Sequence, residues 1–405
     1  MSAYSATIEW LFDRLPMFQR QGGAAYKMDL SRTEALCAHL GHPEKALRVI
    51  HIAGTNGKGS LSHMWAAALQ QHGHTTGLFT SPHLKDFRER IRINAIPISE
   101  EHVVEWVEKH HSFLESSGMS FFEMNVGMAL DIFRQEKVDF AVLEVGMGGR
   151  LDSTNIVDPK LCVITNISMD HQAYLGNSRA QIAREKAGII KKGVPVLIGE
   201  SDDEVRPVFE EIAEERGAPL FFAESMDVPS WPMALKGNYQ KKNRRTFLAS
   251  TRLYSSIEWK EDLLRKGLND GIIENGLRGR WEILSKKPLT IADTGHNEAA
   301  VRLIVEQLQS TSKKNWRVVW GMVEDKDISA ILKLLPKEWI YHWCSPNVPR
   351  GLDANQLAKK ADSNGLNGKV QPDVNKALSS AQSLCSEDEG VFIGGSTFVV
   401  AEVLD

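Results

Sequence analysis

A short glycine-rich segment contains the residue types that bind a polyphosphate. Residues 51–60 read His-Ile-Ala-Gly-Thr-Asn-Gly-Lys-Gly-Ser and directly follow the apolar run 47–50. In such a segment the glycines let backbone N–H groups turn toward phosphate oxygens, Lys58 supplies a positive charge, and Ser60 supplies a hydroxyl for Mg²⁺. A helix that starts near Leu61 would add its positive N-terminal end. The segment therefore predicts the use of a nucleoside triphosphate.

The segment departs from the common phosphate-binding loop. Only Thr55 and Asn56 lie between Gly54 and Gly57, where the usual pattern has four residues. Gly59 also separates the lysine from the hydroxyl residue. The alternative interpretation is a plain glycine turn between a strand and a helix, with no ligand.

A carboxylate ends a later apolar run that reads as a buried strand. Glu144 ends the run 140–144, and residues 145–155 after it are rich in glycine. A carboxylate at a strand end near a phosphate loop is well placed to hold Mg²⁺ through oxygen. The alternative is a buried glutamate whose oxygens accept hydrogen bonds from the backbone.

Two polar residues follow the run 163–167. His171 comes just past this strand end, which favours contact with a metal ion or a phosphate over a structural role. Asp170 is the other candidate metal ligand, and the sequence does not separate the two. Further along, residues 183–190 resemble the end of an amphipathic helix. Lys186 there belongs either to a solvated charged face or to an inward face near the site.

An arginine-rich stretch follows a short Ser-Pro-His segment. Arg88, Arg90 and Arg92 share one side of the chain if residues 87–93 are extended. Three arginines on one face suit an anionic substrate, and Ser81 just before them offers a hydroxyl to a metal ion. The alternative is an exposed edge strand.

A second strand–loop–helix pattern appears near residue 293. In the segment 291–297, Asp293 would accept hydrogen bonds from ribose hydroxyls and His296 would meet the phosphates. The alternative for Asn297 is a helix N-cap. Arg280, shortly before this segment, would reach a triphosphate if two domains close on it.

The elements needed to position these residues alternate between strand and helix. Such alternation predicts an α/β fold with an open, mainly parallel sheet wrapped by helices, and ligands at the carboxyl ends of the strands. Expected strands of the first half are Arg48–Ile52, Thr76–Phe79, Phe140–Glu144, Leu161–Thr165 and Val194–Ile198. Expected helices are Leu61–Gln71, Glu101–Leu114, Asn125–Gln135 and Ala180–Ile190.

A second, smaller α/β domain is expected after residue 278. Residues 223–238 read as loop, two helices should follow over 239–254 and 257–275, and the glycine-punctuated stretch 275–280 suits a linker. We therefore predict domains at 1–278 and 279–405. Expected elements of the second domain are strands Thr290–Asp293, Arg317–Gly321, Trp339–Trp343 and Val391–Gly394, and helices Glu298–Gln309, Asp353–Ala361 and Asn375–Leu384.

Composition sets the broad class. The chain has 405 residues, of which 42% are hydrophobic and 25% charged, with a net charge of −4. These values are typical of a globular protein of two or three domains and argue against a nucleic-acid partner. No apolar run approaches the roughly 20 residues that span a bilayer. Four widely spaced cysteines without a CxxC pair, and no signal-peptide core at the start, favour a cytoplasmic protein.

Taken together, these segments resemble the folylpolyglutamate synthase/dihydrofolate synthase family, within the Mur-ligase-like ATP-dependent amide ligases. The glycine loop alone is shared with other Mur ligases, whereas the Ser-Pro-His, Glu-Val-Gly-x-Gly-Gly-Arg and Arg-Glu-Lys-Ala-Gly stretches are more specific to the folate enzymes. The matching stretches are 54–60, 80–83, 144–152, 170–171, 184–188, 279–280, 293–297 and 395–396.

The resemblance implies roles for individual residues. It implies a P-loop domain and a Rossmann-like C-terminal domain. It also implies ATP and Mg²⁺ as cofactors, K⁺ as a further candidate, and carbamylation of Lys186. Implied catalytic residues are Lys58, Lys186, His171 and His296. Implied nucleotide contacts are Asn56, Gly57, Lys58, Gly59, Ser60, Asn243, Arg280 and Asp293. Implied metal ligands are Ser60, Ser81, Glu144 and His171. Implied substrate contacts are Phe122, Glu123, Asp152, Arg90 and Ser396, with residues 25–28 matching poorly.

The activity implied is ligation of L-glutamate to the carboxylate of dihydropteroate or a reduced folate, through an acyl phosphate, by a monomer. Two rival interpretations stay open. One is a Mur-type ligase that adds a different amino acid to a peptidoglycan precursor. The other is a nucleotide-dependent switch without catalysis, which leaves the loop 293–297 unexplained. The sequence does not decide between one acceptor and two.

Overall fold

A computed structural model describes residues 2–16, 29–324 and 328–404. The chain forms two compact units. The first comprises residues 1–234 and 240–277, and the second comprises residues 235–239 and 278–405. The boundary between Leu277 and Arg278 falls inside the stretch that reads as a linker. The short segment 235–239 packs with the second unit, although the sequence suggested no such return.

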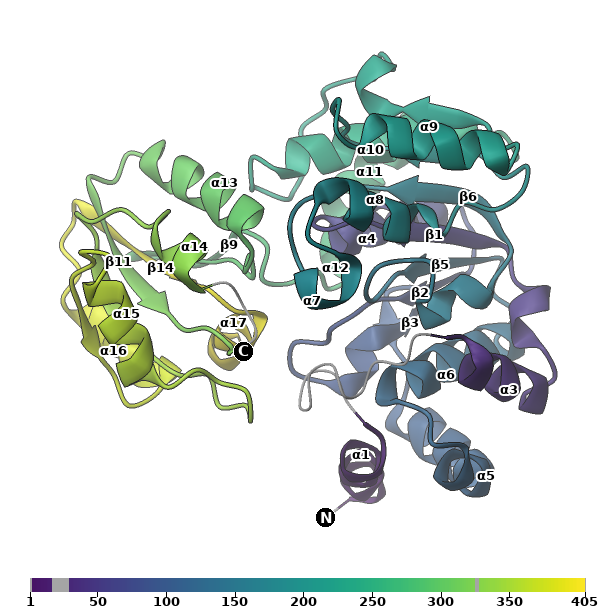
Figure 1. The fold of residues 1–405 in the computed structure, drawn as a ribbon, viewed down its shortest axis with the longest axis horizontal. Coiled ribbons are helices and arrows are strands. Elements are labelled where there is room, and N and C mark those ends of the chain that lie inside the picture. Colours follow the sequence, from purple (N-terminus) through teal and green to yellow (C-terminus); the bar gives the residue numbers. More distant parts are fainter. Residues whose placement is uncertain (1, 17–28, 325–327, 405) are drawn as a thin grey trace. The chain divides into compact units, whose positions relative to one another are not determined.

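The first unit is built on an eight-stranded sheet (Figure 1). Its strand order is β4-β3-β2-β5-β1-β6-β7-β8, and only β3 and β4 run antiparallel to their neighbours. All residues of the central strands β1 and β5 are buried, as expected for parallel strands covered on both faces. The strands are β1 (Val49–Ala53), β2 (Thr76–Phe79), β3 (Ile91–Ile93), β4 (Ile96–Pro97), β5 (Phe140–Glu144), β6 (Pro159–Ile164), β7 (Val196–Ile198) and β8 (Leu220–Phe222).

Helices pack around this sheet and close its cores. One apolar core joins the sheet to α1, α3, α5 and α6, and another joins β6 and β7 to α8 and α9. The helices are α1 (Ala3–Arg14), α3 (Ser31–His39), α4 (Lys58–Gln71), α5 (Glu100–Ser117), α6 (Phe121–Gln135), α7 (Gln172–Leu175), α8 (Arg179–Ala187), α9 (Arg206–Glu215), α10 (Gln240–Leu253), α11 (Glu261–Lys266) and α12 (Ile272–Glu274). Short helical turns are η2 (Pro43–Ala46), η3 (Phe87–Arg90), η4 (Ser153–Ile156), η5 (Ala223–Ser225) and the π-helical η6 (Gly267–Gly271).

The second unit has its own six-stranded sheet in the order β13-β12-β11-β14-β10-β9. All pairings are parallel except that of β9 with β10. Its core is rich in tryptophan and includes Trp316, Trp320 and Trp343. The elements are β9 (Glu282–Lys286), β10 (Leu289–Ala292), α13 (Glu298–Gln309), β11 (Asn315–Trp320), α14 (Ile328–Leu332), β12 (Ile340–Trp343), α15 (Ala354–Asp362), β13 (Gly368–Val370), α16 (Val374–Ser383), β14 (Glu389–Gly394) and α17 (Thr397–Val403).

The predicted α/β class and its strands are confirmed, and one local prediction is wrong. Residues 87–90 form the 3₁₀ turn η3 instead of an extended strand, because Asp86 and Glu89 make a capping box there. The helix expected over 257–275 starts only at residue 261 and runs to residue 274 through the π-helical turn η6. In the described part of the chain, no helix has the length and apolar character needed to cross a membrane.

Candidate functional site

The glycine segment forms a tight loop between β1 and α4, and the helix begins at Lys58 rather than at Leu61. Gly57 has a φ of +84°, and a Cβ there would lie 2.3 Å from Asn243 Oδ1. A side chain at Gly57 is therefore excluded by both backbone conformation and space. Because Asn243 lies on α10, this contact places a residue far away in sequence directly beside the loop. That nearness fits the nucleotide contact implied for Asn243.

Lys58 folds back over its own loop. Its Nζ donates to the carbonyl oxygens of Gly54 and Thr55, each at 3.2 Å. The segment after β6 holds the other side of the loop, since Asn166 Oδ1 accepts from the backbone N–H of Asn56 at 3.0 Å. The loop therefore presents a lysine and a helix N-terminus on a scaffold fixed from two strands. This is the arrangement that the sequence predicted for phosphate binding.

Glu144 lies at the carboxyl end of β5, next to the start of α4. Its Oε2 accepts a hydrogen bond from the backbone N–H of Ser81 at 3.1 Å. A Cβ on Gly59 would lie 3.5 Å from both carboxylate oxygens. Ser60, the next residue, accepts from Gln240 Nε2 at 3.0 Å. Three of the four predicted metal ligands therefore sit at neighbouring strand ends and the helix start.

The chemistry of this donor set fits magnesium. It contains one carboxylate and two hydroxyls, and Mg²⁺ is commonly bound by one or two carboxylates together with waters and substrate phosphates. Among the described residues there is no group of three or more His, Cys, Asp or Glu that could hold a metal by themselves. Waters and phosphate oxygens would complete the coordination of Mg²⁺ at such a site.

His171, the fourth predicted metal ligand, starts the short helix α7. Its backbone has a φ of +52°, and its Nε2 lies 3.9 Å from Asp170 Oδ1. Ser168, three residues earlier, is tied to the glycine loop, because its N–H donates to Thr55 Oγ1 at 3.0 Å. Both alternatives for this ligand therefore follow a segment anchored to the loop, and the geometry does not choose between them.

Lys186 points inward, in agreement with one of the two interpretations of the sequence. It is 4% exposed, and its Nζ donates to the carbonyl oxygen of Gly54 at 2.9 Å. Burial, and then the nearby charge of Lys58, lower the pKa of Lys186 to about 7. Arg184 takes the solvated side of the same helix and pairs with Glu211 at 2.7 Å. The glycine loop thus has two lysine side chains against it.

The three arginines do not share a face, so that prediction is wrong. Arg88 pairs with Asp86 at 2.8 Å, whereas Arg92 is buried and donates to the carbonyl oxygen of Ala95. Arg90 is buried, and its Nε donates to His83 Nδ1 at 2.7 Å. Burial lowers the pKa of Arg90 to about 10. Of the three, Arg90 alone bonds a side chain of the Ser-Pro-His segment, which keeps it near the predicted metal site.

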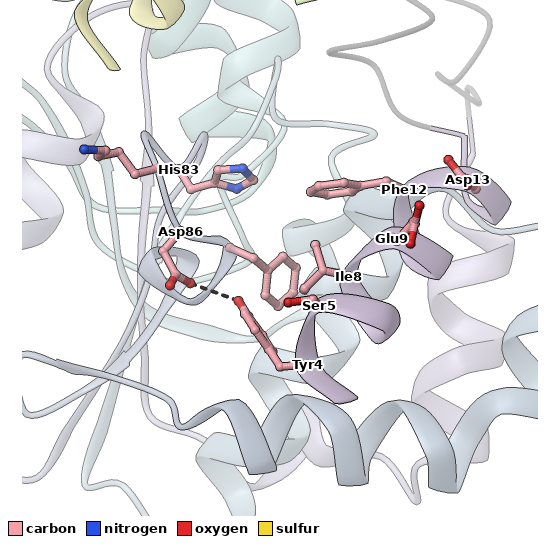
Figure 2. A pocket seen from close by; sticks show the side chains of 10 residues that line it. Tyr4, Ser5, Ile8, Glu9, Phe12, Asp13, His83 and Asp86 are labelled. Atoms are coloured by element: carbon pink, nitrogen blue, oxygen red, sulfur yellow. Dashed lines mark hydrogen bonds between the residues drawn. The ribbon is translucent and has the colours of Figure 1, made fainter. Parts of the chain in front are cut away.

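A cavity of about 510 Å³ lies between α1 and residues 83–87 (Figure 2). The rings of Phe12 and His83 face each other there with centroids 6.5 Å apart. Tyr4 closes one end by donating to Asp86 at 2.9 Å. Burial and the charge of Arg90 lower the pKa of His83 to about 3. The cavity is therefore walled on this side by a neutral ring of the Ser-Pro-His segment.

The predicted substrate contacts near β5 have local structural roles as well. Glu123 forms a capping box with Ser120 at the start of α6, with the Ser120 N–H at 2.6 Å from its carboxylate. Asp152 is 4% exposed and caps η4. Phe122 lies against Gly146, where a Cβ would come within 2.4 Å of its ring. Phe122 and Asp152 therefore border the same glycine-rich loop, whereas Glu123 is engaged by its own helix.

The predicted residues of the second unit gather at the carboxyl ends of its strands. Asp293 follows β10 and is held by three donors: Tyr239 Oη at 2.5 Å and the N–H groups of Trp281 and Gly295, each at 2.8 Å. Burial raises the pKa of Asp293, and the Tyr239 hydrogen bond opposes this rise. Asn297 is the N-cap of α13, which confirms the alternative given for it.

The remaining predicted residues of this unit also lie at loops and helix starts. Arg280 bonds the carbonyl oxygen of Gly279 and the hydroxyl of Thr294. His296 Nδ1 lies 3.0 Å from the carbonyl oxygen of Thr294, and Ser396 caps α17. Arg280 and His296 therefore meet at Thr294 within the second unit.

Sequence reasoning missed three residues that shape the site. Gln240 bonds Ser60, Tyr239 bonds Asp293, and Thr165 donates to the carbonyl oxygen of Asn56 at 2.6 Å. Each comes from a distant part of the chain and lies in no recognisable motif. A single sequence carries no signal for such contacts.

Comparison with known proteins assigns the family. The Mur ligase middle domain model matches residues 52–260, and the model of the Mur ligase glutamate ligase domain matches residues 279–397. The dihydrofolate synthase/folylpolyglutamate synthase of Bacillus subtilis (strain 168) is 31% identical over 99% of this chain and 98% of its own. The chain belongs to the dihydrofolate synthase/folylpolyglutamate synthase family. It is therefore an enzyme of the ATP-dependent ligase class.

Solved structures of the family superpose closely on this chain. Escherichia coli FolC in complex with DHPP and ADP has a TM-score of 0.88 at 30% identity, covering 99% of this chain and 97% of the other. A bifunctional folylpolyglutamate synthase/dihydrofolate synthase with Mn, AMPPNP and L-glutamate bound has a TM-score of 0.86 at 31% identity, covering 100% and 97%. Both the predicted family and the predicted α/β architecture are thereby confirmed.

Proposed function

We propose that this family member joins the amino group of L-glutamate to the carboxylate of dihydropteroate, of a reduced folate, or of both. The observation that carries the proposal is the meeting of Glu144, Ser81 and Gly59 beside the Lys58 loop. Oxygen atoms suited to a divalent cation, beside a loop suited to phosphates, support this activity. The relatives' complexes with ADP, DHPP, AMPPNP and L-glutamate support the same substrates.

The chemistry follows from the need to activate a carboxylate. An acceptor carboxylate oxygen attacks the γ-phosphorus of ATP, which releases ADP and leaves an acyl phosphate. The glutamate amine, having lost a proton, then attacks the acyl carbon, and inorganic phosphate leaves as the amide forms. Lys58 and the start of α4 would hold the transferring phosphoryl group in line, so that the protein contributes mainly position and charge.

In this proposal Ser60, Ser81, Glu144 and His171 hold a divalent cation, Mg²⁺ in the cell. Bound there, the cation would neutralise charge on the transferring phosphoryl oxygens. The complex of a relative with Mn supports a divalent ion. K⁺ is a further proposed cofactor. Glu144→Gln is expected to raise the Mg²⁺ concentration needed for half-maximal ATP turnover, and an unchanged requirement would remove Glu144 from this role.

Lys186 is proposed to carry a carbamate. Carbamylation needs a neutral amine that attacks CO₂ and releases a proton, and a pKa of about 7 supplies the neutral amine near neutral pH. The carbamate would turn this amine near Gly54 into an anion. With ¹³C-bicarbonate, we expect a carbamate resonance that Lys186→Met abolishes. An identical spectrum in the variant would contradict the assignment.

We propose the remaining roles by unit. In the first unit (ATP-binding, predicted as 1–278), Asn56, Gly57, Gly59 and Asn243 contact the nucleotide, and Phe122, Glu123, Asp152 and Arg90 lie toward the acceptor. In the second (ligase, 279–405), Arg280, Asp293, His296 and Ser396 contact nucleotide or substrate. We further propose that the enzyme is cytoplasmic, which its four widely spaced cysteines support, and that it acts as a monomer.

The test is glutamate-dependent ADP release with a panel of acceptors. We expect turnover with dihydropteroate or tetrahydrofolate and L-glutamate, and comparison of these two acceptors separates the two activities of the family. Turnover only with a peptidoglycan precursor would instead favour a Mur-type ligase. ATP hydrolysis without any acceptor dependence would favour a nucleotide switch.

A further inference from the structure

The buried side chains of His51, Thr154 and Asp152 form a hydrogen-bonded row. His51, in the middle of β1, is fully buried, and its Nε2 lies 2.8 Å from Thr154 Oγ1. The Thr154 hydroxyl lies 2.5 Å from Asp152 Oδ1, and the Thr154 backbone N–H donates to the same oxygen at 3.0 Å. The row therefore connects the strand that leads into the glycine loop with the carboxylate of Asp152.

The direction of the protons in this row can be assigned. A hydroxyl has one proton, and the short contact shows that Thr154 gives it to Asp152. His51 must then donate through Nε2–H, and its Nδ1 carries only a lone pair. This agrees with Nδ1, which is buried and has no hydrogen-bond partner among the described residues. The reverse direction would need a protonated Asp152 and would leave a buried N–H donor without an acceptor, which is the costlier arrangement.

Asp152 also borders the loop on which Phe122 packs. Its Oδ2 accepts from the backbone N–H of Met147 at 2.9 Å, and the Phe122 ring covers Gly146, the residue before. The Phe122 ring and the buried Asp152 carboxylate therefore flank the dipeptide Gly146-Met147. This pair suits a flat heteroaromatic ring that bears N–H donors, because the ring stacks on Phe122 while its N–H groups reach the carboxylate.

We infer that His51 and Thr154 are positioning residues that hold Asp152 as an ionised acceptor for an N–H group of the pterin ring of the substrate. This inference rests on the proposed function and deepens it, since it explains how a buried carboxylate stays ionised. Neither residue touches the substrate; both act through Asp152.

The charges around the row agree with this role. Burial raises the pKa of Asp152, and the hydrogen bonds of Thr154 and Met147 work against that rise. Burial and the charge of Lys191 lower the pKa of His51 to about 3, so the imidazole stays neutral. Lys186 also acts electrostatically on Asp152. Removing the Thr154 hydroxyl should therefore raise the pKa of Asp152 further.

Thr154→Val tests the inference, because it removes the hydroxyl and keeps the shape. We expect the KM for the pterin acceptor to rise about ten-fold near neutral pH, since one hydrogen bond to a charged group is lost. The KM for ATP should change less than two-fold. The rise should shrink as the pH increases, because the carboxyl ionises again. Thr154→Ser, which keeps the hydroxyl, should restore the acceptor KM.

Thr251→Val is the matched control, because Thr251 is also a buried threonine of the first unit and bonds only the carbonyl oxygen of Leu248 in its own helix. It should leave the acceptor KM and its pH profile unchanged. Selective ¹⁵N-histidine NMR, with His51→Asn to assign the signal, should show the Nε2–H tautomer of a neutral ring. This measurement needs no substrate.

Three results would overturn the inference. They are an unchanged acceptor KM in Thr154→Val, an equal rise in the KM for ATP without a pH shift, and an Nδ1–H tautomer at His51. If the wild-type enzyme turns over with neither pterin acceptor, the proposed function and this inference fall together. Wild-type turnover combined with any of the three results removes this inference alone.

Discussion

Each of the two units contains a strand–loop–helix segment, but the first loop carries a lysine charge and the second a buried carboxylate. In the first unit β1 runs through a glycine loop into α4, and in the second β10 runs through Asp293–Asn297 into α13. The first loop has Lys58 and Lys186 donating to its carbonyl oxygens, and Lys58 is a cation that a polyphosphate would neutralise. In the second loop, Asp293 already accepts three hydrogen bonds from its own unit. The first loop offers donors and positive charge to an anion, whereas the carboxylate of the second loop accepts hydrogen bonds within its own unit.

This contrast teaches that the same strand–loop–helix pattern in the sequence does not give the same role. A loop rich in glycine and lysine leaves donors and charge for an external anion. In a loop with a buried carboxylate, the carboxylate oxygens already accept hydrogen bonds from donors of the folded chain. Substitutions in the first loop should therefore reduce activity, whereas substitutions in the second should first reduce stability.

The largest effect is expected at Lys58. Lys58→Ala removes the charge that would face the transferring phosphoryl group, and we expect kcat for ligation to fall about 10³-fold. The melting temperature should stay close to that of the wild type, because the hydrogen bonds of the side chain within the described residues go to its own loop. Steady-state ADP release and thermal unfolding measure the two quantities.

Lys241→Ala is the control, since Lys241 is an exposed lysine of the same unit. It should retain full activity. Comparable activity in both variants would contradict the assignment of Lys58.

Lys186 gives the next largest effect, seen as a dependence of stability on pH. Its pKa is about 7 in the folded state and 10.5 as the ordinary value. Between these values the unfolded chain binds the proton more, so the contribution of Lys186 to the free energy of unfolding rises with pH, by at most about 1.4 kcal/mol per pH unit. Lys186→Met removes this slope. In CO₂-free buffer, its stability advantage over the wild type should be greatest at and below pH 7 and should shrink toward pH 10.

Denaturant unfolding of both proteins across this pH range makes the measurement. The difference isolates Lys186 from the other lysines. A difference that does not vary with pH would mean that the amine titrates normally and is not buried as described.

Asp293→Asn should destabilise the second unit. Whichever way the amide lies, its NH₂ group would face at least one of the three donors that Asp293 now accepts from. We expect a loss of roughly 1–3 kcal/mol in the free energy of unfolding. Asp388→Asn is the matched control, because Asp388 and its partner Lys314 are both exposed; it should leave the free energy of unfolding close to that of the wild type. Equal losses in the two variants would refute the contrast between the loops.

The smallest effect is expected at Asn297. Its side chain accepts from the N–H of Ala300 at 3.0 Å and caps α13. Asn297→Ala should cost about 1 kcal/mol in the free energy of unfolding, and Asn297→Ser should recover most of it. Calorimetry of the two variants makes the test, because a cap role predicts that the serine variant is more stable than the alanine variant.

Strands, most helices and the strand-end position of the site were predictable because they depend on local apolar runs and on the rule for parallel sheets. Glu144 at the end of β5 is an example. The 3₁₀ turn at 87–90 was missed although Asp86 and Glu89 carry its capping box in the sequence. The same holds for Ser120 and Glu123 at the start of α6. In both places a structural signal was present and overlooked.

Other features were beyond the reach of a single sequence. The orientation of Lys186 depends on which face of α8 packs on the glycine loop, and the sequence pattern allowed either face. The row from His51 to Asp152 joins residues about a hundred positions apart. Contacts of this kind are fixed by tertiary packing, which local spacing does not encode.

The most direct test of the account follows one oxygen atom. With ¹⁸O in the acceptor carboxylate, formation of an acyl phosphate moves one labelled oxygen to the phosphate that leaves when the amide forms. The account predicts one ¹⁸O in inorganic phosphate for each amide made, measured by mass spectrometry. Unlabelled phosphate with normal amide formation would contradict activation of the carboxylate by ATP at the Lys58 loop.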